Sequence, residues 1–255
     1  MRNRNIIAAL LMLLAGMQTS NAQKMVVKLT DNQTIKYNVS QVECVTFEEA
    51  GEHEYVDLGL PSGTLWATCN VGANSPEEYG DYFAWGETEP KGEYNWSTYR
   101  YSKGSMKTIT KYCASSDYGY NGFTDGLTEL LPEDDAATAN WGSDWQMPSY
   151  DQCVELYNTD NTTTEWTKMN GVNGRKITSK NKNNGNWIFI PAGGYFNNSK
   201  LNNAGTYADY WSRSLNTDDS SYAFYFYFNS SVFGMNGGQG FYRSNGRTVR
   251  PVRKQ

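Results

Sequence analysis

The chain has 255 residues, of which 38% are hydrophobic and 19% charged, and it is rich in Tyr (19), Trp (8) and Gly (24). This length can bury a core without the help of disulfides, and the composition argues against a helical bundle, which would contain more Ala, Leu, Glu and Lys. The formal net charge is −5, and without Arg2 and Arg4 it becomes −7, with 20 basic against 27 acidic side chains. Nucleic acid and anionic membranes are therefore disfavoured as partners.

Residues 1–22 have the pattern of a secretory signal. Arg2 and Arg4 give a basic start, residues 6–17 an apolar run, and Ser20-Asn21-Ala22 a small-residue cleavage site. The apolar run is short for a membrane span and no second run follows, so we expect no transmembrane segment. The expected cleavage site contains no cysteine, so the sequence does not indicate a lipid anchor. The protein is expected to be exported, and to be secreted, periplasmic or on the cell surface.

A small β appendage is expected at residues 23–50. The stretches MVVKL (25–29) and TIKYNV (34–39) predict a hairpin, and VECVTF (42–47) predicts a third strand. The polar stretch 48–54 contains a glycine and predicts a linker, which we place at 51–53. The main domain then covers residues 54–255.

Within the main domain the sequence predicts two short helices, strands and long polar loops. YVDLGL and TLWATC predict strands joined by a Pro61-Ser62-Gly63 turn, and residues 132–137 predict a helix start with acids in its first turn. Ser149, followed by Gln152, predicts the N-cap of a helix over 150–157. Further strands are predicted at 187–190, 207–213, 222–228, 240–243 and 247–252. The fold class is therefore α+β, with mostly antiparallel strands.

The sequence gives little support for metal binding or catalysis. The mature chain has four cysteines, and its single histidine, His53, lies in the expected linker and leaves a catalytic triad without a base. Residues 117–125 carry oxygen ligands but lack the terminal Glu of an EF-hand loop. The acids Glu87, Glu89, Asp134 and Asp135 could supply a carboxylate pair for glycoside hydrolysis, although capping is a commoner use of such acids. We therefore expect no enzyme, no cofactor and no metal site. The cysteines are Cys44, Cys69, Cys113 and Cys153. They could form two disulfides in any of three pairings, and the alternative is that some are free thiols.

The main domain contains the motifs EYVDLGLPSGTLWATCNVGA (54–73), DYFAWGETEPK (81–91), PEDDAATANWGSDWQMPS (132–149), YWS (210–212) and GRTVRPV (246–252). Together these motifs resemble a bacterial family, Fib_succ_major (major paralogous domain), over about residues 54–253. The resemblance implies a C-type lectin-like fold. Residues 210–252 also resemble the variable region of target proteins of diversity-generating retroelements, which display altered ligand-binding residues on this scaffold. The EPN, QPD and WND tripeptides typical of calcium-dependent sugar binding are absent, so a protein or another surface ligand is expected.

The aromatic stretch at residues 222–231 is the expected binding face. In a strand, Phe224, Phe226 and Phe228 point to one side and Tyr225 and Tyr227 to the other. We expect the phenylalanines inside and the tyrosines in solvent, because binding surfaces favour Tyr, Ser, Gly and Asn. The alternative is that the tyrosines cover a second layer of the domain.

A loop at residues 233–243 is expected to complete this face, and residues 246–252 to belong to the scaffold. Arg247 and Arg250 would face opposite sides of a strand there, and at least one is expected to pair with a carboxylate. Trp141, Trp145 and Trp211 are expected in the core and in the floor of the site, and Trp211 is also counted among the predicted contact residues. The predicted ligand-binding residues are Trp211, Arg213, Tyr222, Tyr225, Tyr227, Asn229, Phe233, Met235, Asn236, Gln239, Phe241, Tyr242 and Arg243.

The sequence thus predicts a non-catalytic ligand-binding protein outside the cytoplasm, with an extracellular protein or surface ligand as its partner. The alternative is a structural subunit of a bacterial envelope or surface appendage, in which the N-terminal strands dock and the aromatic loop makes fixed subunit contacts.

Overall fold

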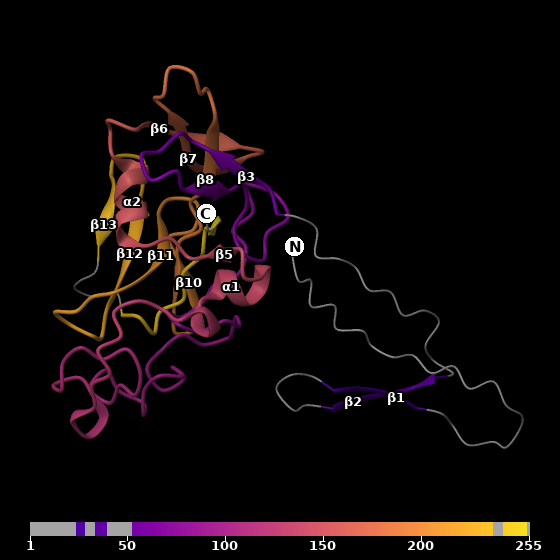
Figure 1. The fold of residues 1–255 in the computed structure, drawn as a ribbon, viewed down its shortest axis with the longest axis vertical. Helices are drawn as coiled ribbons and strands as arrows, with labels where there is room; N and C mark the ends of the chain where they lie inside the picture. Colours follow the sequence, from indigo (N-terminus) through magenta and orange to yellow (C-terminus); the bar gives the residue numbers. More distant parts are fainter. Residues whose placement is uncertain (1–23, 29–33, 40–52, 237–241, 254–255) are drawn as a thin grey trace, which may run out of the picture. The chain divides into compact units, whose positions relative to one another are not determined.

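The computed structural model describes residues 24–28, 34–39, 53–236 and 242–253. Contacts within the chain divide it into two units, Met1–Gly51 and Glu52–Gln255 (Figure 1). The expected signal at 1–22 and the expected third strand at 42–47 lie outside the described residues.

The first unit contains the expected hairpin. Strands β1 (Lys24–Lys28) and β2 (Thr34–Asn38) pair antiparallel, with Met25 opposite Tyr37. Ile35, Tyr37 and Val39 are between 39% and 45% exposed. Among the described residues of this unit only these two strands pair, and a two-stranded hairpin by itself buries little apolar surface.

The second unit is α+β, with antiparallel strands in several sheets and two α-helices (Figure 1). A four-stranded sheet has the order β3-β4-β14-β5, and two three-stranded sheets have the orders β6-β7-β8 and β11-β12-β13. Strands β9 and β10 form a separate hairpin. The strands are β3 (Tyr55–Asp57), β4 (Leu65–Ala67), β5 (Trp145–Gln146), β6 (Thr162–Met169), β7 (Val172–Ser179), β8 (Trp187–Pro191), β9 (Tyr195–Asn197), β10 (Lys200–Asn202), β11 (Ala208–Leu215), β12 (Ala223–Phe228), β13 (Phe233–Asn236) and β14 (Val252–Arg253).

The strand predictions are confirmed at β3, β4, β8, β11 and β12, whereas one loop prediction and two strand predictions need correction. Strand β13 replaces the first part of the loop expected at 233–243. Residues 246–248 form isolated bridges, and only Val252–Arg253 pair as a strand. Of the strand expected at 240–243, Tyr242 and Arg243 are described, and neither belongs to a strand. The long hairpin β6–β7 was not predicted, because its Thr, Lys and Asn residues resemble loop composition.

The two helices are short and are fixed by their caps. Helix α2 (Tyr150–Tyr157) has the predicted capping box, in which the Ser149 hydroxyl accepts from Gln152 N and the Gln152 side chain accepts from Ser149 N. Helix α1 (Ala136–Trp141) starts later than expected. Residues Pro132–Asp134 form a 3-10 turn, and Asp135 caps α1 by accepting from Thr138 N at 3.0 Å.

Two hydrophobic cores pack on opposite faces of β11 and β12. The phenylalanine-side core contains Tyr210, Phe226 and Phe228 from these strands, together with Trp66, Leu156 and Ile190 from β4, α2 and β8. The tyrosine-side core contains their sequence neighbours Trp211 and Tyr225, together with Trp85, Tyr112 and Val249. Both faces of this sheet are therefore covered, unlike a sheet with one side in water.

Buried arginines hold the second unit together. Arg243, Arg247 and Arg250 are completely inaccessible. Arg250 donates to the carbonyls of Ala67, Thr68 and Phe189 and to the side chain of Asn70. Since Ala67 lies on β4 and Phe189 on β8, one guanidinium joins two different sheets. Residues 246–252 are thus scaffold, as expected.

Within the described ranges, no helix is long and apolar enough to cross a membrane. Cys69, Cys113 and Cys153 are free thiols, and Cys44 lies outside the described residues.

Candidate functional site

The predicted alternation of β12 is present, but its tyrosine face is not a surface. Phe226 and Phe228 are fully buried in the phenylalanine-side core, whereas Phe224 is half-buried against Tyr150. On the other face Tyr225 is 0% exposed. The prediction that Tyr225 faces solvent is therefore wrong, and the second-layer alternative is correct for this residue. Tyr227, near the end of the strand, is only half-buried.

The layer that covers Tyr225 is organised by Arg247. The guanidinium lies between two rings, 4.0 Å from the centroid of Trp211 and 4.1 Å from that of Tyr225. Its Nε is 3.4 Å from a carboxylate oxygen of Asp209, and both side chains are completely buried. The expected pairing of Arg247 with a carboxylate is thereby confirmed. Because Arg is only weakly hydrated and stacks well on rings, it suits this position better than Lys would.

Burial controls the ionisation of this cluster. Removal from water raises the pKa of Asp209 to about 6, although the neighbouring Arg247 acts in the opposite direction. Burial, together with Asp209, also raises the pKa of Tyr207. Asp209 and Arg247 thus form a rigid ionic centre beneath the surface rather than a site open to a ligand.

Two other predicted contact residues also belong to the core. Trp211 is 0% exposed, and its indole donates to the carbonyl of Phe83 at 2.8 Å. Arg243 donates to the carbonyls of Tyr112 and Lys111 at 2.6 and 2.7 Å. Neither side chain can reach a ligand outside this fold, so their assignment to the contact residues is wrong, whereas the core position expected for Trp211 is confirmed. Their size and hydrogen-bonding groups suit a binding face equally well, which is why the sequence did not separate the two roles.

Five half-buried rings from separate segments form what we call the aromatic rim: Trp96, Tyr207, Tyr222, Tyr227 and Tyr242. Tyr222 and Tyr242 stack with their centroids 5.2 Å apart and their planes 6° apart, and Trp96 meets Tyr242 edge-on at 5.7 Å. Tyr227 stacks on Tyr207 at 5.9 Å. All five are partly accessible.

Arg247 links the two groups of rings in the rim. It contacts Tyr225, whose ring lies 6.4 Å from that of Tyr227, and it donates to the Tyr242 carbonyl at 3.4 Å. The rim is therefore supported from below by buried side chains.

The remaining predicted residues are distributed over both faces of the β11-β12-β13 sheet. Asn236 pairs with Tyr225 and shares its face, whereas Met235 and Phe233 pair with Phe226 and Phe228 and pack against the opposite core. Met235 and Phe233 were thus expected on the wrong side, because the sequence predicted a loop there.

The other predicted residues are held by polar contacts. The Asn229 carbonyl accepts from Arg175, and Arg213 pairs with Glu129 at 2.8 Å, near the start of β12. Gln239 and Phe241 lie outside the described residues.

The sequence missed Trp96 and Tyr207 as rim residues. Trp96 lies in a loop far from β12 along the chain, and no local pattern connects them. Tyr207 immediately precedes β11 and was assigned to a strand without a role. The only sequence feature that pointed to further rim residues was the large number of tyrosines in the chain.

Three of the four candidate catalytic acids, Glu87, Asp134 and Asp135, have structural partners. Glu87 pairs with Lys91 at 2.7 Å. Asp134 accepts from Tyr101, Tyr112 and Lys111. Among the described residues, no group of three His, Cys, Asp or Glu side chains could hold a metal ion. His53 stacks on Trp141 with 3.6 Å between ring centroids.

No family model, curated protein or solved structure matches this chain. The resemblance to the Fib_succ_major family and to a C-type lectin-like fold therefore stays a prediction.

Proposed function

We propose that the chain is an exported, non-catalytic binding protein that uses the aromatic rim on a C-type lectin-like scaffold to bind an extracellular protein or another surface ligand. The observation that carries this proposal is the arrangement of the rim. Partly accessible rings from separate segments stack in two groups, and the buried Arg247, paired with Asp209, contacts residues of both. Such rings offer large contact area at a small entropic cost, and tyrosine hydroxyls add hydrogen bonds.

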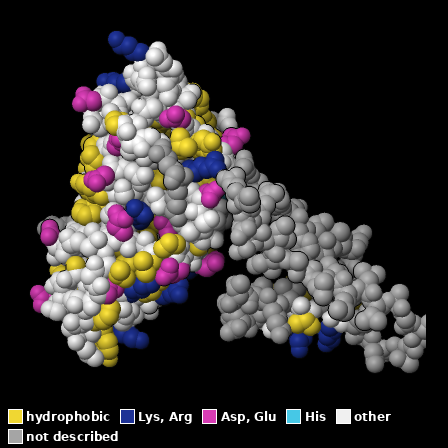
Figure 2. Space-filling view, in the orientation of Figure 1, with side chains coloured by type: hydrophobic (Ala, Val, Ile, Leu, Met, Phe, Trp, Pro, Cys, Tyr) yellow, Lys and Arg dark blue, Asp and Glu magenta, His cyan; other side chains and the backbone are white. Residues whose placement is uncertain are grey.

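The distribution of charge supports a protein partner over a polyanion. Figure 2 shows basic and acidic side chains scattered among each other on the visible face, without a large patch of one sign. The net charge of −5 agrees with this view.

Two observations support the non-catalytic part of the proposal. The imidazole of His53 is engaged in stacking on Trp141. Three of the candidate acids have structural partners: Glu87 pairs with a lysine, and Asp134 accepts from two tyrosines and a lysine. Asp135 caps the N-terminus of α1.

We further propose that residues 210–252 are diversified by a retroelement. Tyr222, Tyr227, Asn236 and Tyr242 fall within this segment and are partly accessible. The test is the neighbouring DNA. A near-copy of these codons that differs at adenines, beside a reverse transcriptase gene, is the expected finding, and its absence would contradict diversification but not binding.

The binding test uses the full chain and a triple variant with Tyr222, Tyr227 and Tyr242 changed to Ala. Labelled protein is titrated onto a panel of cell surfaces and purified extracellular proteins. We expect saturable binding to a member of the panel, weakened about 100-fold in the triple variant, since interface tyrosines are common hot spots. Tyr120→Ala removes a 45% exposed tyrosine outside the rim and should bind normally. Equal binding by the triple variant would refute the role of the rim.

The hairpin favours a second candidate, a structural subunit of an envelope or appendage. Exposed Ile35, Tyr37 and Val39 could dock between subunits. In that case the protein should copurify in a stoichiometric assembly, whereas a receptor should bind its ligand as a monomer.

A further inference from the structure

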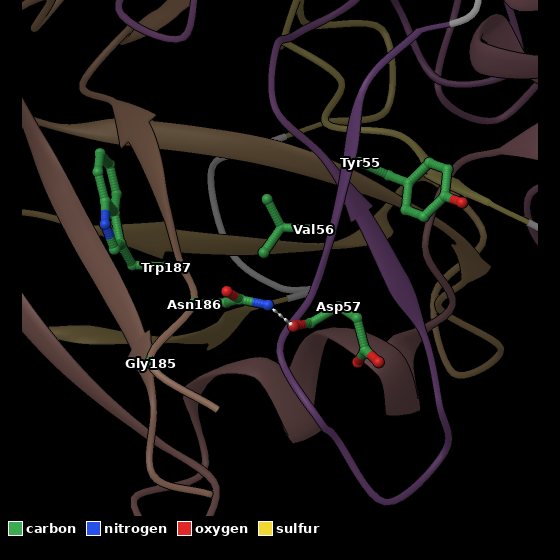
Figure 3. A pocket seen from close by; sticks show the side chains of 6 residues that line it. All are labelled: Tyr55, Val56, Asp57, Gly185, Asn186 and Trp187. Atoms are coloured by element: carbon green, nitrogen blue, oxygen red, sulfur yellow. Dashed lines mark hydrogen bonds between the residues drawn. The ribbon is translucent and has the colours of Figure 1, made fainter. Parts of the chain in front are cut away.

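A pocket of about 290 Å³ lies between β3 and the start of β8 (Figure 3). Its lining consists of Tyr55, Val56 and Asp57 from β3 and Gly185, Asn186 and Trp187 at β8. Both strands end their sheets, because the sheet orders are β3-β4-β14-β5 and β6-β7-β8. A smaller pocket of about 110 Å³ also includes Trp187, together with Thr68, Pro76, Ile188 and Phe189. Each strand therefore has an edge that pairs with no other strand of the described chain.

The hydrogen-bond ladder fixes which backbone groups of β3 point away from β4. Thr68 N donates to the Glu54 carbonyl at 3.0 Å, and Val56 is the next residue to face β4. Directions alternate along an antiparallel ladder, so the N–H and C=O groups of Tyr55 and Asp57 point to the other side. The Asp57 carbonyl accepts there from the side-chain amides of Asn184 and Asn186, both at 2.9 Å.

The backbone groups of β8 alternate in the same way. Ser179 N donates to the Asn186 carbonyl at 2.9 Å, so Asn186 and Ile188 face β7. Trp187 and Phe189 therefore direct their backbone groups away from β7. The Phe189 carbonyl accepts from Arg250 at 3.0 Å. Within the described part of the chain, the backbone N–H and C=O of Tyr55 and Trp187 have no hydrogen-bond partner.

We propose that this pocket captures a short extended segment of a partner protein by β-strand addition. Donors and acceptors offered by Tyr55 and Trp187 are complementary to a peptide main chain, which presents an N–H and a C=O to the same edge at every second residue, about 6.6–6.8 Å apart. The bound segment would join two sheets that the structure leaves separate.

The side chains around the pocket favour small β-branched or apolar residues in the segment. Figure 3 shows Val56 pointing from β3 toward β8, while the Tyr55 ring lies on the opposite side of β3. The Trp187 side chain is 41% exposed and available for contact. Asn186, bonded to the Asp57 carbonyl, closes one end. The volume lies near the lower limit for ligand sites, so the core of the segment should be two to three residues.

The probe is the blocked peptide acetyl-Thr-Val-Thr-Val-Thr-amide, added to the ¹⁵N-labelled full chain. We expect saturable shifts of the Tyr55 and Trp187 amide signals with a Kd below about 1 mM. Hydrogen exchange of these two amides should slow on binding. An analogue with N-methylvaline at both valines lacks the N–H donors of one edge and should bind at least about tenfold more weakly.

Two glycines provide a matched pair of variants. Gly185 lines the pocket and Gly92 does not, and in both cases an added Cβ would meet nothing within 4 Å. Gly185→Phe should fill the pocket and weaken the peptide about tenfold or more, whereas Gly92→Phe should bind within about twofold of the native chain. The Tyr222, Tyr227 and Tyr242 triple variant should retain the peptide, which separates this site from the proposed function of the rim.

Three results would overturn the proposal. One is the lack of saturable shifts at Tyr55 and Trp187 up to about 5 mM peptide. Another is equal affinity for the N-methylated peptide. The third is strong protection of these two amides from hydrogen exchange in the peptide-free protein. If this protection is independent of protein concentration, a segment of the same chain occupies the pocket. If it rises with protein concentration, a second copy of the chain occupies it.

Discussion

At the residue scale, Tyr225 and Tyr227 share one face of β12 but have different surroundings. Tyr225 is fully buried against Arg247 and Trp211, whereas Tyr227 is partly accessible. Tyr225→Ala should therefore leave a cavity and lower the free energy of unfolding by about 3–5 kcal/mol. Tyr227→Ala should cost less, about 1–2 kcal/mol, because its ring is partly accessible and the space that it leaves stays open to water. Urea unfolding of both variants measures the difference.

The exposed Tyr120 provides the control for these two variants. Tyr120→Ala removes a 45% exposed ring and should change the free energy of unfolding by less than about 0.5 kcal/mol. If Tyr225→Ala were as mild as Tyr120→Ala, the second layer over β12 would not exist in solution, and the original assignment of Tyr225 to the surface would be restored.

The buried Asp209 makes a separate prediction for the dependence of stability on pH. Burial raises its pKa from 3.8 to about 6 in the folded state. The folded state therefore binds the Asp209 proton more tightly than the unfolded chain does. The resulting contribution to the free energy of unfolding is fully present below about pH 4 and is lost as the pH rises through 6. This difference in pKa between the folded and unfolded states corresponds to roughly 3 kcal/mol in the free energy of unfolding.

The Asp209→Asn variant isolates this contribution, because asparagine does not titrate. The free energy of unfolding of the native chain should fall relative to that of the variant between pH 4 and 7. Urea unfolding at several pH values measures both curves. Parallel curves would mean that Asp209 keeps an ordinary pKa, and that Arg247 compensates fully for the cost of burial.

At the scale of elements, local signals predicted what depends on local contacts. Helix α2 was predicted because Ser149 and Gln152 satisfy each other's backbone groups within one turn. The strand at β12 and its alternation were also predicted, since they follow from residues that are neighbours in the chain. The hairpin β1–β2 belongs to the same class.

The elements that were missed depend on distant partners. β6–β7 is rich in Thr and Lys, and its pairing with β8 gives it a covered face that its composition does not indicate. β13 is short and contains a glycine, but it is held by β12. Pattern alone assigns a residue to a face of a strand, and only the tertiary fold decides whether that face meets water.

The predictions for the candidate site show the same difference between residues set by local pattern and residues set by distant contacts. Tyr222, Tyr227 and Tyr242 were predicted and are partly accessible. Trp96 joins them through a loop that no local rule connects to β12. The two largest errors, Tyr225 and Arg243, are residues whose types suit a binding surface and a packed, hydrogen-bonded interior equally well.

At the scale of the whole molecule, Arg250 joins sheets that otherwise have separate ladders. Its guanidinium donates to the carbonyls of Ala67 and Thr68 at the end of β4 and to that of Phe189 on β8. Arg250→Met would remove these donors and leave buried acceptors without partners, each at about 1–3 kcal/mol. We expect the variant to lose at least about 3 kcal/mol of its free energy of unfolding.

Arg250→Lys tests whether charge alone is sufficient. Lysine keeps the positive charge, but its compact ammonium cannot span acceptors on two sheets as the planar guanidinium does. It should therefore recover little of the lost stability. Arg253→Met is the matched control, because Arg253 is partly exposed and lies 3.8 Å from the exposed Asp144, a pair worth less than about 1 kcal/mol.

Hydrogen exchange separates a bridge between sheets from ordinary core packing. If Arg250 couples the sheets, Arg250→Met should increase exchange together at the backbone amides of β4 and β8, although these strands share no ladder. Amides of β6, which lie two strands from Arg250, should change less. Faster exchange confined to β14, the strand that starts two residues after Arg250, would show that the guanidinium stabilises only its own segment, and that packing alone holds the sheets together.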